Sequence, residues 1–369
     1  MASCDPREGS KPSGGQSPLK RRRRPRYSGT HPKDFAHKYK EQNLEAHPEI
    51  EAHLREKGIT PAGTHVPVLV EEVMEWLRPA PGDIVADCTV GYGGHALEFM
   101  KRIGPSGKLI AMDVDAPELE RTRQRLSKES MPASFHHGNF AGIAKVLTQE
   151  KLDGFDIIFA DLGVSSMQID DPERGMSYKH EGPLDLRMDD RLRQTGADLL
   201  NSLSEEELSN ALWELADEPD HQKIARLIVA RRAGQPIAQT SQLVEIVFDA
   251  KDLDKKTWRR QQQASGAGTL HPAARTFQAL RILVNDELGS LKELLRLAPY
   301  CLRPGGRIGI ISFHSGEDRL VKKSFRDGVR NGTYEMIAKD IIVPSPEEAR
   351  RNPRSASAKF RWAVRARIP

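Results

Sequence analysis

The chain has 369 residues, enough for one large domain or two of ordinary size. Its formal net charge is +4, from 56 Lys and Arg against 52 Asp and Glu, so the charge permits a nucleic-acid partner without requiring one. Three cysteines without metal-binding or disulfide spacing suit a reducing compartment, and no apolar run of about 18 residues is present, so we expect a cytoplasmic protein with no metal and no membrane span.

Residues 1–60 have the composition of a basic N-terminal arm. Apolar residues are sparse there, and Arg21 to Arg24 form a run of four cations. Such a segment cannot bury enough apolar surface to offset its ordering entropy, so we expect a flexible arm. A solvated tail and an arm that grips RNA phosphates both stay open as interpretations.

Beyond the arm, the pattern predicts a helix that begins at Val70 and is stopped by Pro79, followed by strands that alternate with helices. The strands are expected at residues 84–88, 108–113, 134–137, 155–160, 307–313 and 360–364, with a long helix from residue 273 to about residue 302. Apolar strands that alternate with helices are typical of a parallel sheet covered on both faces.

The alternation stops after about residue 170, where the sequence predicts only helices and loops for about a hundred residues. Ser204 followed by three glutamates is a good helix start, and apolar residues recur with helical spacing further on. We therefore expect a sheet domain made of residues 61–170 and 271–369, interrupted by an inserted helical domain of residues 171–270.

Residues 84–95, with the sequence IVADCTVGYGGH, predict a strand that passes through a glycine-rich turn into a helix. Such a corner lets a ligand approach the backbone and presents free amides to it. The glycines do not follow the G-x-G-x-x-G spacing of dinucleotide sites. Asp113, about 20 residues past the turn, is placed to accept hydrogen bonds from ribose hydroxyls. We therefore favour an adenosine-containing cofactor over a purely structural corner.

Ligands of open parallel sheets bind outside the carboxyl ends of the strands, so residues that directly follow strands are the candidates for chemistry. Asp161 ends a buried strand, where its carboxylate could accept a hydrogen bond from an exocyclic amine and orient that amine toward an electrophilic methyl group. His314 follows a later strand and could face the same pocket, although a lone histidine in a loop is more often structural.

Cysteine placement argues against methylation of a pyrimidine at C5, which needs a thiolate that adds to the ring. No cysteine lies near Asp161 in the sequence. Cys88 falls within the first expected strand and is better explained as a core residue, and Cys301 precedes a strand, at the opposite end from the expected site. The residues therefore favour chemistry without a covalent enzyme intermediate.

Longer motifs resemble the bacterial 16S rRNA cytosine-N4 methyltransferases of the RsmH/MraW type. They are DLGVSSMQID at 161–170, GPLDLRMD at 182–189, HPAARTFQALR at 271–281, PGGR at 304–307, ISFHS at 311–315 and NPR at 352–354. The resemblance covers roughly residues 62–367 and leaves the arm outside. It implies an α/β fold, the class I S-adenosylmethionine-dependent methyltransferase fold with a Rossmann-like, mainly parallel sheet, and an inserted α-helical domain that recognises the substrate.

The same resemblance implies direct in-line methylation of N4 of a cytidine in the decoding region of 16S rRNA, within the small ribosomal subunit. S-adenosyl-L-methionine would be the cofactor, with Asp113 on the ribose and Phe140 against the adenine. The full set of implied cofactor contacts is Gly93, Gly94, His95, Asp113, Phe140, Asp161 and Gln168.

Two other functions stay open from the residues. One is a DNA amino-methyltransferase, whose usual Asp/Asn-Pro-Pro-aromatic run is absent at residues 161–164. The other is a ribosome-assembly protein that binds RNA with the same fold and no catalysis. If RNA is the partner, arginines of the insertion and of the basic C-terminal stretch from Arg350 to Arg367 would hold its phosphates, without specifying the base. The candidates in the insertion are Arg187, Arg191, Arg193, Arg231 and Arg232.

Overall fold

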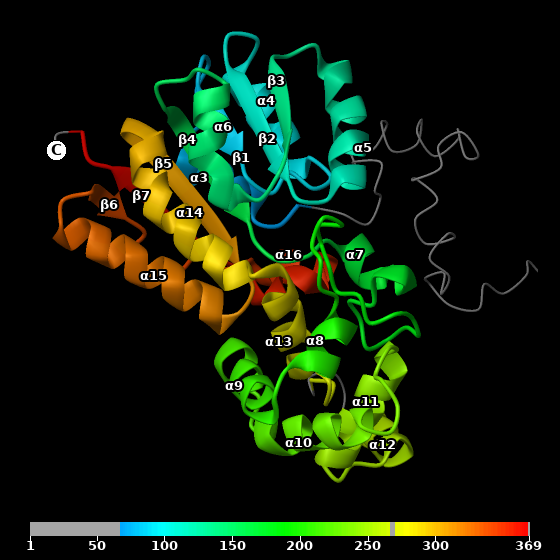
Figure 1. Ribbon diagram of the computed structural model, residues 1–369. Coiled ribbons are helices and arrows are strands. Elements are labelled where there is room, and N and C mark those ends of the chain that lie inside the picture. The colour runs from blue at the N-terminus through cyan, green and yellow to red at the C-terminus, as the bar shows by residue number, and fades with distance from the viewer. Residues whose placement is uncertain (1–66, 266–269, 368–369) are drawn as a thin grey trace, which may run out of the picture. The chain divides into compact units, whose positions relative to one another are not determined.

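The computed structural model describes residues 67–265 and 270–367, all of which belong to one compact unit (Figure 1). The basic arm expected at residues 1–60 lies outside the described residues. No described helix is long and apolar enough to cross a membrane.

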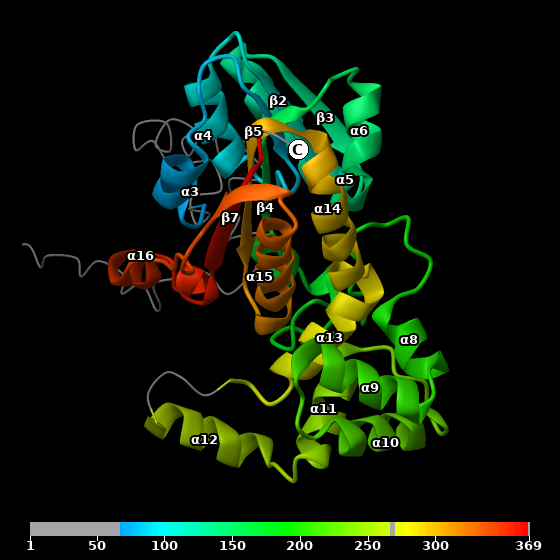
Figure 2. The ribbon, with the colours of Figure 1, turned by 90° about the vertical axis from the view of Figure 1, so that its left-hand side faces the viewer.

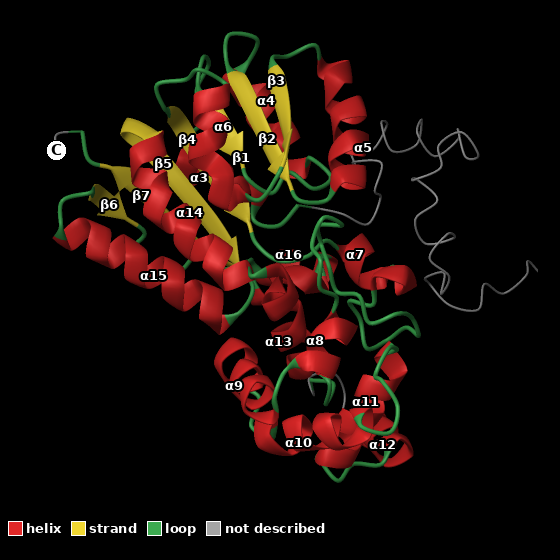
Figure 3. Cartoon of the chain, in the orientation of Figure 1, coloured by secondary structure: helices red, strands yellow, loops and turns green. Residues whose placement is uncertain are grey.

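A seven-stranded sheet forms the centre of the described fold (Figure 3), with the strand order β3-β2-β1-β4-β5-β7-β6. Its strands are β1 (Ile84–Asp87), β2 (Lys108–Asp113), β3 (Ala133–His137), β4 (Phe155–Asp161), β5 (Leu302–Ser312), β6 (Tyr334–Ile337) and β7 (Lys359–Arg365). Strands β1 to β5 pair in parallel, and β7 runs antiparallel to both β5 and β6. The expected Rossmann-like, mainly parallel sheet is confirmed, and the short edge strand β6 is an addition.

Helices cover both faces of the sheet, which is why β2 and β4 are apolar along almost their whole length (Figure 2). One apolar layer packs under α3 (Val70–Leu77), α4 (Gly94–Ile103) and α5 (Ala116–Leu126). The opposite layer packs under α6 (Ile143–Gln149), α14 (Glu287–Cys301) and α15 (Ser315–Arg330). Both layers hold the strands rigidly, so the residues at the strand ends keep fixed positions.

The prediction of one long helix from residue 273 is wrong, because the chain forms two helices there, α13 (Ala274–Asn285) and α14. Asp286 separates them with a left-handed φ of 45°. The break coincides with contacts to the insertion: the Asn285 amide donates to the Leu186 carbonyl and accepts from the Met188 amide. Strand β5 also begins earlier than expected, because Pro304 and the glycines after it form an irregularity inside the strand.

The helical insertion contains α8 (Gly196–Ser202), α9 (Glu205–Ala216), α10 (His221–Arg232), α11 (Thr240–Ala250) and α12 (Lys255–Ser265). A third apolar cluster holds α8 to α11 together and extends from Met176 to Val284. It includes Phe277 and Leu280 of α13, so the expected boundary between residues 270 and 271 passes through this cluster. The insertion lies at one end of the sheet (Figure 1).

Candidate active site

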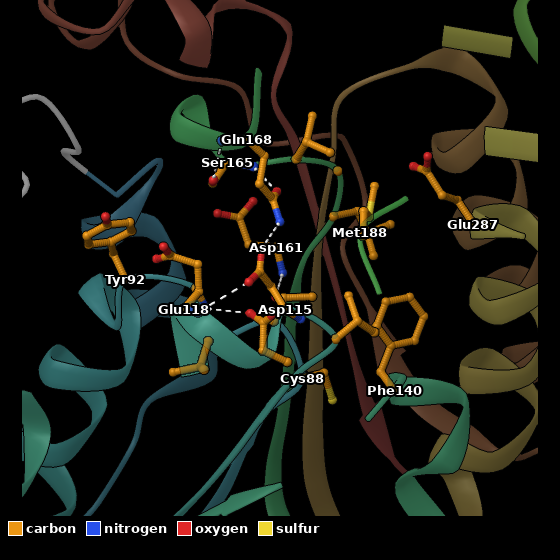
Figure 4. Close-up of a pocket in the computed structure, with 18 of the residues that line it drawn as sticks. Cys88, Tyr92, Asp115, Glu118, Phe140, Asp161, Ser165, Gln168, Met188 and Glu287 are labelled. Carbon is orange, nitrogen blue, oxygen red and sulfur yellow. Dashed lines mark hydrogen bonds between the residues drawn. The ribbon is translucent and has the colours of Figure 1, made fainter. Parts of the chain in front are cut away.

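A cavity of about 350 Å³, within the usual size range of ligand sites, opens at the carboxyl ends of the parallel strands (Figure 4). Strand ends and the turns that follow them form one wall. The insertion and α14 form the other, where Figure 4 shows Met188 and Glu287 across the cavity from Tyr92 and Glu118. The insertion therefore completes a site that the sheet alone leaves open.

Most residues expected at the cofactor line this cavity. They are Gly94, His95, Asp113, Phe140, Asp161 and Gln168. Gly93 is not among the lining residues. It precedes α4 with a φ of 73°, and a Cβ there would lie 2.9 Å from the Thr122 methyl carbon, so the turn itself requires glycine. Gly93 therefore shapes the turn between β1 and α4 without lining the cavity.

His314 does not line the cavity. It is the N-cap of α15, and its Nδ1 accepts a hydrogen bond from the Gly316 amide at 3.2 Å. Its Nε2 lies 3.3 Å from Glu317 Oε1. Both ring nitrogens therefore face the start of the helix, because the capping geometry turns the imidazole back toward the chain. Glu317 does reach the cavity.

Asp113 ties the glycine-rich turn to the end of β2. Its Oδ2 accepts from the Gly91 amide at 2.8 Å, and its Oδ1 accepts from the Asp115 amide at 2.9 Å. Burial raises the pKa of this carboxyl to about 6. A carboxylate has about four acceptor positions, so two backbone bonds leave room for ribose hydroxyls.

Gln168 lines the cavity, but both ends of its amide have partners within the protein. Its Oε1 accepts from the Ser165 amide at 2.9 Å, and its Nε2 donates to Asp115 Oδ2 at 2.9 Å. The side chain links the start of α7 (Ser166–Asp170) to Asp115, the N-cap of α5. Sequence reasoning missed Asp115, although an aspartate followed within two residues by proline is a recognisable helix start.

Asp161 is the least satisfied polar group in the cavity. Its Oδ1 is buried and accepts no hydrogen bond from the residues that the structure describes. Burial, followed by the nearby carboxylates of Asp87 and Glu317, raises its pKa to about 8. Its Oδ2 lies 3.9 Å from Nδ1 of His95. Such a group is an acceptor that lacks a donor.

His95 cannot supply a positive charge to Asp161. Its Nε2 lies 2.8 Å from the Val68 carbonyl and therefore donates to it, which leaves Nδ1 without a proton in the neutral ring. Burial lowers the pKa of His95 to about 4, so the ring is neutral at physiological pH. The imidazole serves as a fixed neutral wall beside the carboxyl group.

Acidic side chains far outnumber basic ones in the cavity lining, and most of them have a cationic neighbour. Glu118 pairs with Arg121, Asp115 with Arg174, Asp189 with Arg191, and Glu287 with Arg281. Glu317 lies beside His314, and Asp113 and Asp161 have no Lys or Arg partner within the described part of the chain. The two unpaired carboxyl groups both follow parallel strands, so the sheet edge favours a ligand with positive charge.

The second wall of the cavity was not predicted from the sequence. It includes Ser290, whose hydroxyl accepts a hydrogen bond at 2.8 Å from the Asn139 side chain of the strand wall, together with residues of the insertion. Met188 and Asp189 fall within a family motif, but no pattern shows that they face the strand ends, because packing between distant segments brings the two walls together. The complete additional set from this wall is Met188, Asp189, Leu192, Asn285, Glu287 and Ser290.

Most arginines expected to hold RNA phosphates already have partners inside the chain. Arg187 and Arg191 form two-point pairs with Asp185 and Asp189, and Arg231 pairs with Asp249. Arg232 donates to a backbone carbonyl, and Arg193 is exposed. These side chains stabilise the insertion, whatever else they contact.

Comparison with known proteins finds a match to the MraW methylase family over residues 62–366. A protein of Alkaliphilus metalliredigens named ribosomal RNA small subunit methyltransferase H 2 is 45% identical over 351 residues, 94% of this chain and 98% of the relative. One of Lachnoclostridium phytofermentans, ribosomal RNA small subunit methyltransferase H 1, is 43% identical over 359 residues, 96% of each chain. A Koribacter versatilis protein, ribosomal RNA small subunit methyltransferase H, is 42% identical over 309 residues, covering 82% of this chain and 94% of its own.

The two longest of these matches extend beyond the family segment. Only three residues follow position 366, so alignments that cover 94% and 96% of the chain must include much of the segment before residue 62. Much of the segment before residue 62, which the family resemblance left outside, is therefore aligned with at least two relatives.

Proposed function

This chain belongs to the MraW methylase family, and from that premise we propose that it methylates N4 of a cytidine in the 16S rRNA of the small ribosomal subunit. Its fold is the class I methyltransferase fold, with an inserted helical domain. The relatives bear the name of small-subunit rRNA methyltransferases, which supports rRNA as the substrate. The choice of N4 and of the decoding region rests on the motifs, and we place the protein in the cytoplasm, where ribosomal subunits are found.

This proposal rests mainly on Asp113 and Asp161, the two carboxyl groups at the strand ends that have no Lys or Arg partner among the described residues. A cavity that is acidic and short of cations disfavours a free anion and favours a cationic ligand. The buried Oδ1 of Asp161, which lacks a donor, is a further sign that a ligand group belongs there. S-adenosylmethionine, when bound, supplies an electrophilic methyl group on a positively charged sulfur.

The residues that would hold this cofactor follow from their places in the cavity. Gly91 and Gly94 line the cavity at the start of α4, where a glycine backbone lets a ligand approach closely. Asp113 would accept the ribose hydroxyls, and Phe140 would pack against the adenine. Asp161 lies between this cofactor side and the wall made by the insertion.

For the transfer itself, Asp161 would accept a hydrogen bond from the exocyclic amine of the cytosine and fix its direction. That amine is conjugated with the ring and reacts poorly unless its lone pair is held in line with the methyl group. Cys88 also lines the cavity, but burial raises the pKa of its thiol well above the usual value. A thiolate that could add to the ring is therefore not available, which supports the N4 assignment over C5.

The affinity for S-adenosylmethionine should rise with pH up to about pH 8. In the free protein, burial and neighbouring carboxylates place the pKa of Asp161 at about 8, so this group is mostly protonated at neutral pH. A bound cation favours the ionised form, so binding releases a proton, and affinity rises by at most about tenfold per pH unit until the group is ionised. Calorimetric titrations at pH 6.5, 7.5 and 8.5 measure this slope.

S-adenosylhomocysteine is the matched control ligand in this titration, because it has the same amino acid and adenosine parts without the sulfonium charge. Its affinity should change less with pH, and the Asp161→Asn variant should remove the difference between the two ligands. Identical slopes for both ligands in the unmodified protein would show that Asp161 does not face the sulfonium.

Labelled S-adenosylmethionine tests the function when offered with small ribosomal subunits, naked 16S rRNA and duplex DNA in parallel. After digestion to nucleosides, label in N4-methylcytidine from rRNA supports the proposal. Label in C5-methylcytidine or in DNA contradicts it. Cofactor binding without transfer to any substrate would instead favour the ribosome-assembly alternative.

A further inference from the structure

Arg354 is the only Lys or Arg among the described residues that line the cavity. Seven acidic residues share that lining, so this one guanidinium differs in charge from its surroundings. Its side chain is 45% exposed. The residue therefore stands at the boundary between an acidic interior and the solvent.

The fold holds Arg354 in this position from two sides. Its Nη2 lies 3.0 Å from Oδ2 of Asp170, the last residue of α7, whose side chain is only 10% exposed. On its own segment, the fully buried Ser355 bonds through both its amide and its hydroxyl to the Asn352 carbonyl, at 2.9 and 2.8 Å. An exposed arginine that is fixed at both its backbone and its head group loses little entropy on binding.

The helix before Arg354 is anchored in turn. In helix α16 (Pro346–Arg351), Glu348 Oε1 accepts a hydrogen bond at 2.8 Å from the backbone amide of Leu69, which lies at the start of α3. The segment therefore joins three parts of the molecule at the cavity rim: the entry to α3, the end of α7 and the strand β7 that follows. Asp170 accepts from only part of the Arg354 guanidinium. That group has five N–H donors, so it can also donate to a second anion.

The chemistry of the substrate indicates what that second anion is. A cytidine within RNA must leave its stack to place its base in such a cavity, and its phosphates come with it. Asp113 is mostly ionised at neutral pH, and further carboxylates line the interior, so a phosphate is disfavoured there and the RNA backbone must stop at the rim. Arginine binds phosphate oxygens through paired N–H groups, which fixes position without reading the base.

We propose that Arg354, oriented by Asp170, binds a phosphate next to the target cytidine at the rim of the cavity and so sets how deep the base enters. This proposal rests on the proposed rRNA substrate. Arg354 is a binding residue in this account, and Asp170 is a positioning residue that acts through it. The acidic interior and the single cation at its edge together admit the base and keep the backbone outside.

The test compares Arg354→Gln, Arg354→Lys and Asp170→Asn with the unmodified protein on small ribosomal subunits. Arg354→Gln should raise the KM for subunits about tenfold, with the Kd for S-adenosylmethionine changed less than twofold. It should also lower the slope of log affinity against log salt by about 0.7, as expected for one lost phosphate contact. Filter binding of subunits without cofactor gives that slope independently of turnover.

The two milder variants separate charge from geometry. Arg354→Lys keeps the charge but loses the planar fork, so it should retain the salt slope and recover only part of the KM. Asp170→Asn should raise KM about threefold, without changing the salt slope. Arg350→Gln is the matched control, because Arg350 is exposed in the same segment, is not among the cavity lining, and donates to the Pro346 carbonyl.

Three results would overturn the inference. Unchanged KM and salt slope in Arg354→Gln would exclude a phosphate contact. A weakened cofactor Kd with unchanged binding of subunits would mean that the arginine binds the carboxylate of S-adenosylmethionine instead. If Arg350→Gln changed KM and the salt slope as much as Arg354→Gln does, the effect would come from the overall charge of the segment and not from a specific phosphate contact. If the unmodified protein does not methylate rRNA at all, the proposed function fails, and that outcome is distinct from these three.

Discussion

The Asp161→Ala variant is expected to lose methyl transfer by about 10²–10³-fold in kcat, the range found when one positioned hydrogen-bonding group is removed from an active site. The same variant should be at least as stable as the unmodified protein. Asp161 Oδ1 has no hydrogen-bond partner among the described residues, and burial raises the pKa of the carboxyl to about 8. Removing a buried polar group that has no partner removes its desolvation cost.

Single-turnover transfer to small subunits measures the loss, and thermal unfolding measures the stability. Asp161→Asn separates two roles, because it keeps the shape and an acceptor oxygen but cannot ionise. An intermediate rate in that variant would assign the effect to hydrogen bonding, and a rate as low as that of alanine would assign it to charge. Asp327→Ala, on the exposed face of α15 with Lys323 and Arg330 as neighbours, is the control carboxylate. Normal turnover in Asp161→Ala would remove this residue from the mechanism.

The largest effect on stability is expected from the ion pair that spans the break between α13 and α14. Arg281 contacts Glu287 through Nε at 2.8 Å and Nη2 at 3.0 Å, with only 16% and 11% of the two side chains exposed. Arg281→Met leaves the Glu287 carboxylate largely buried without its partner. Removal of one member of a buried pair costs about 3–5 kcal/mol, so the free energy of unfolding should fall by that amount.

The double variant Arg281→Met with Glu287→Met tests this explanation. Replacing both members of a buried pair by apolar residues of similar volume is often neutral, so the double variant should regain most of the lost stability. Urea denaturation of the full chain measures all three proteins. A loss below about 1 kcal/mol in the single variant, or no recovery in the double, would show that the pair is not a buried electrostatic unit.

Cofactor affinity should be affected as well, because Glu287 lines the cavity and Asn285 ties the same break to the insertion. The stability measurement comes first, since a partly unfolded variant binds nothing. Calorimetry at a temperature well below the transition then reports whether the second wall of the cavity has moved.

The sheet could be predicted from the sequence because its central strands are covered on both faces. Strands β2 and β4 are short apolar runs that end in Asp113 and Asp161, so the strand prediction and the site prediction came from the same pattern. Strand β6 was missed because it is a four-residue edge strand with two exposed positions.

The second wall of the cavity could not be predicted in the same way. The break at Asp286 coincides with hydrogen bonds between Asn285 and residues of the insertion almost a hundred positions earlier. No periodicity in the sequence reports such a contact. Gln168 came from the family resemblance alone, since an amide in a short helix is not distinctive. Phe140 was a candidate from its place after a predicted strand, and only its packing against the adenine came from the resemblance.

The placement of the insertion has a consequence for how the chain folds during synthesis. Strands β4 and β5 are neighbours in the sheet, but all of residues 162–301 must be made before β5 exists. Helices make mostly local contacts and form quickly, whereas pairing of distant parallel strands is slow. The helical domain can therefore fold before β5 is made, while one edge of β4 is still unpaired. Until β5 arrives, that apolar edge is a site for misassociation, and a nascent chain needs protection there.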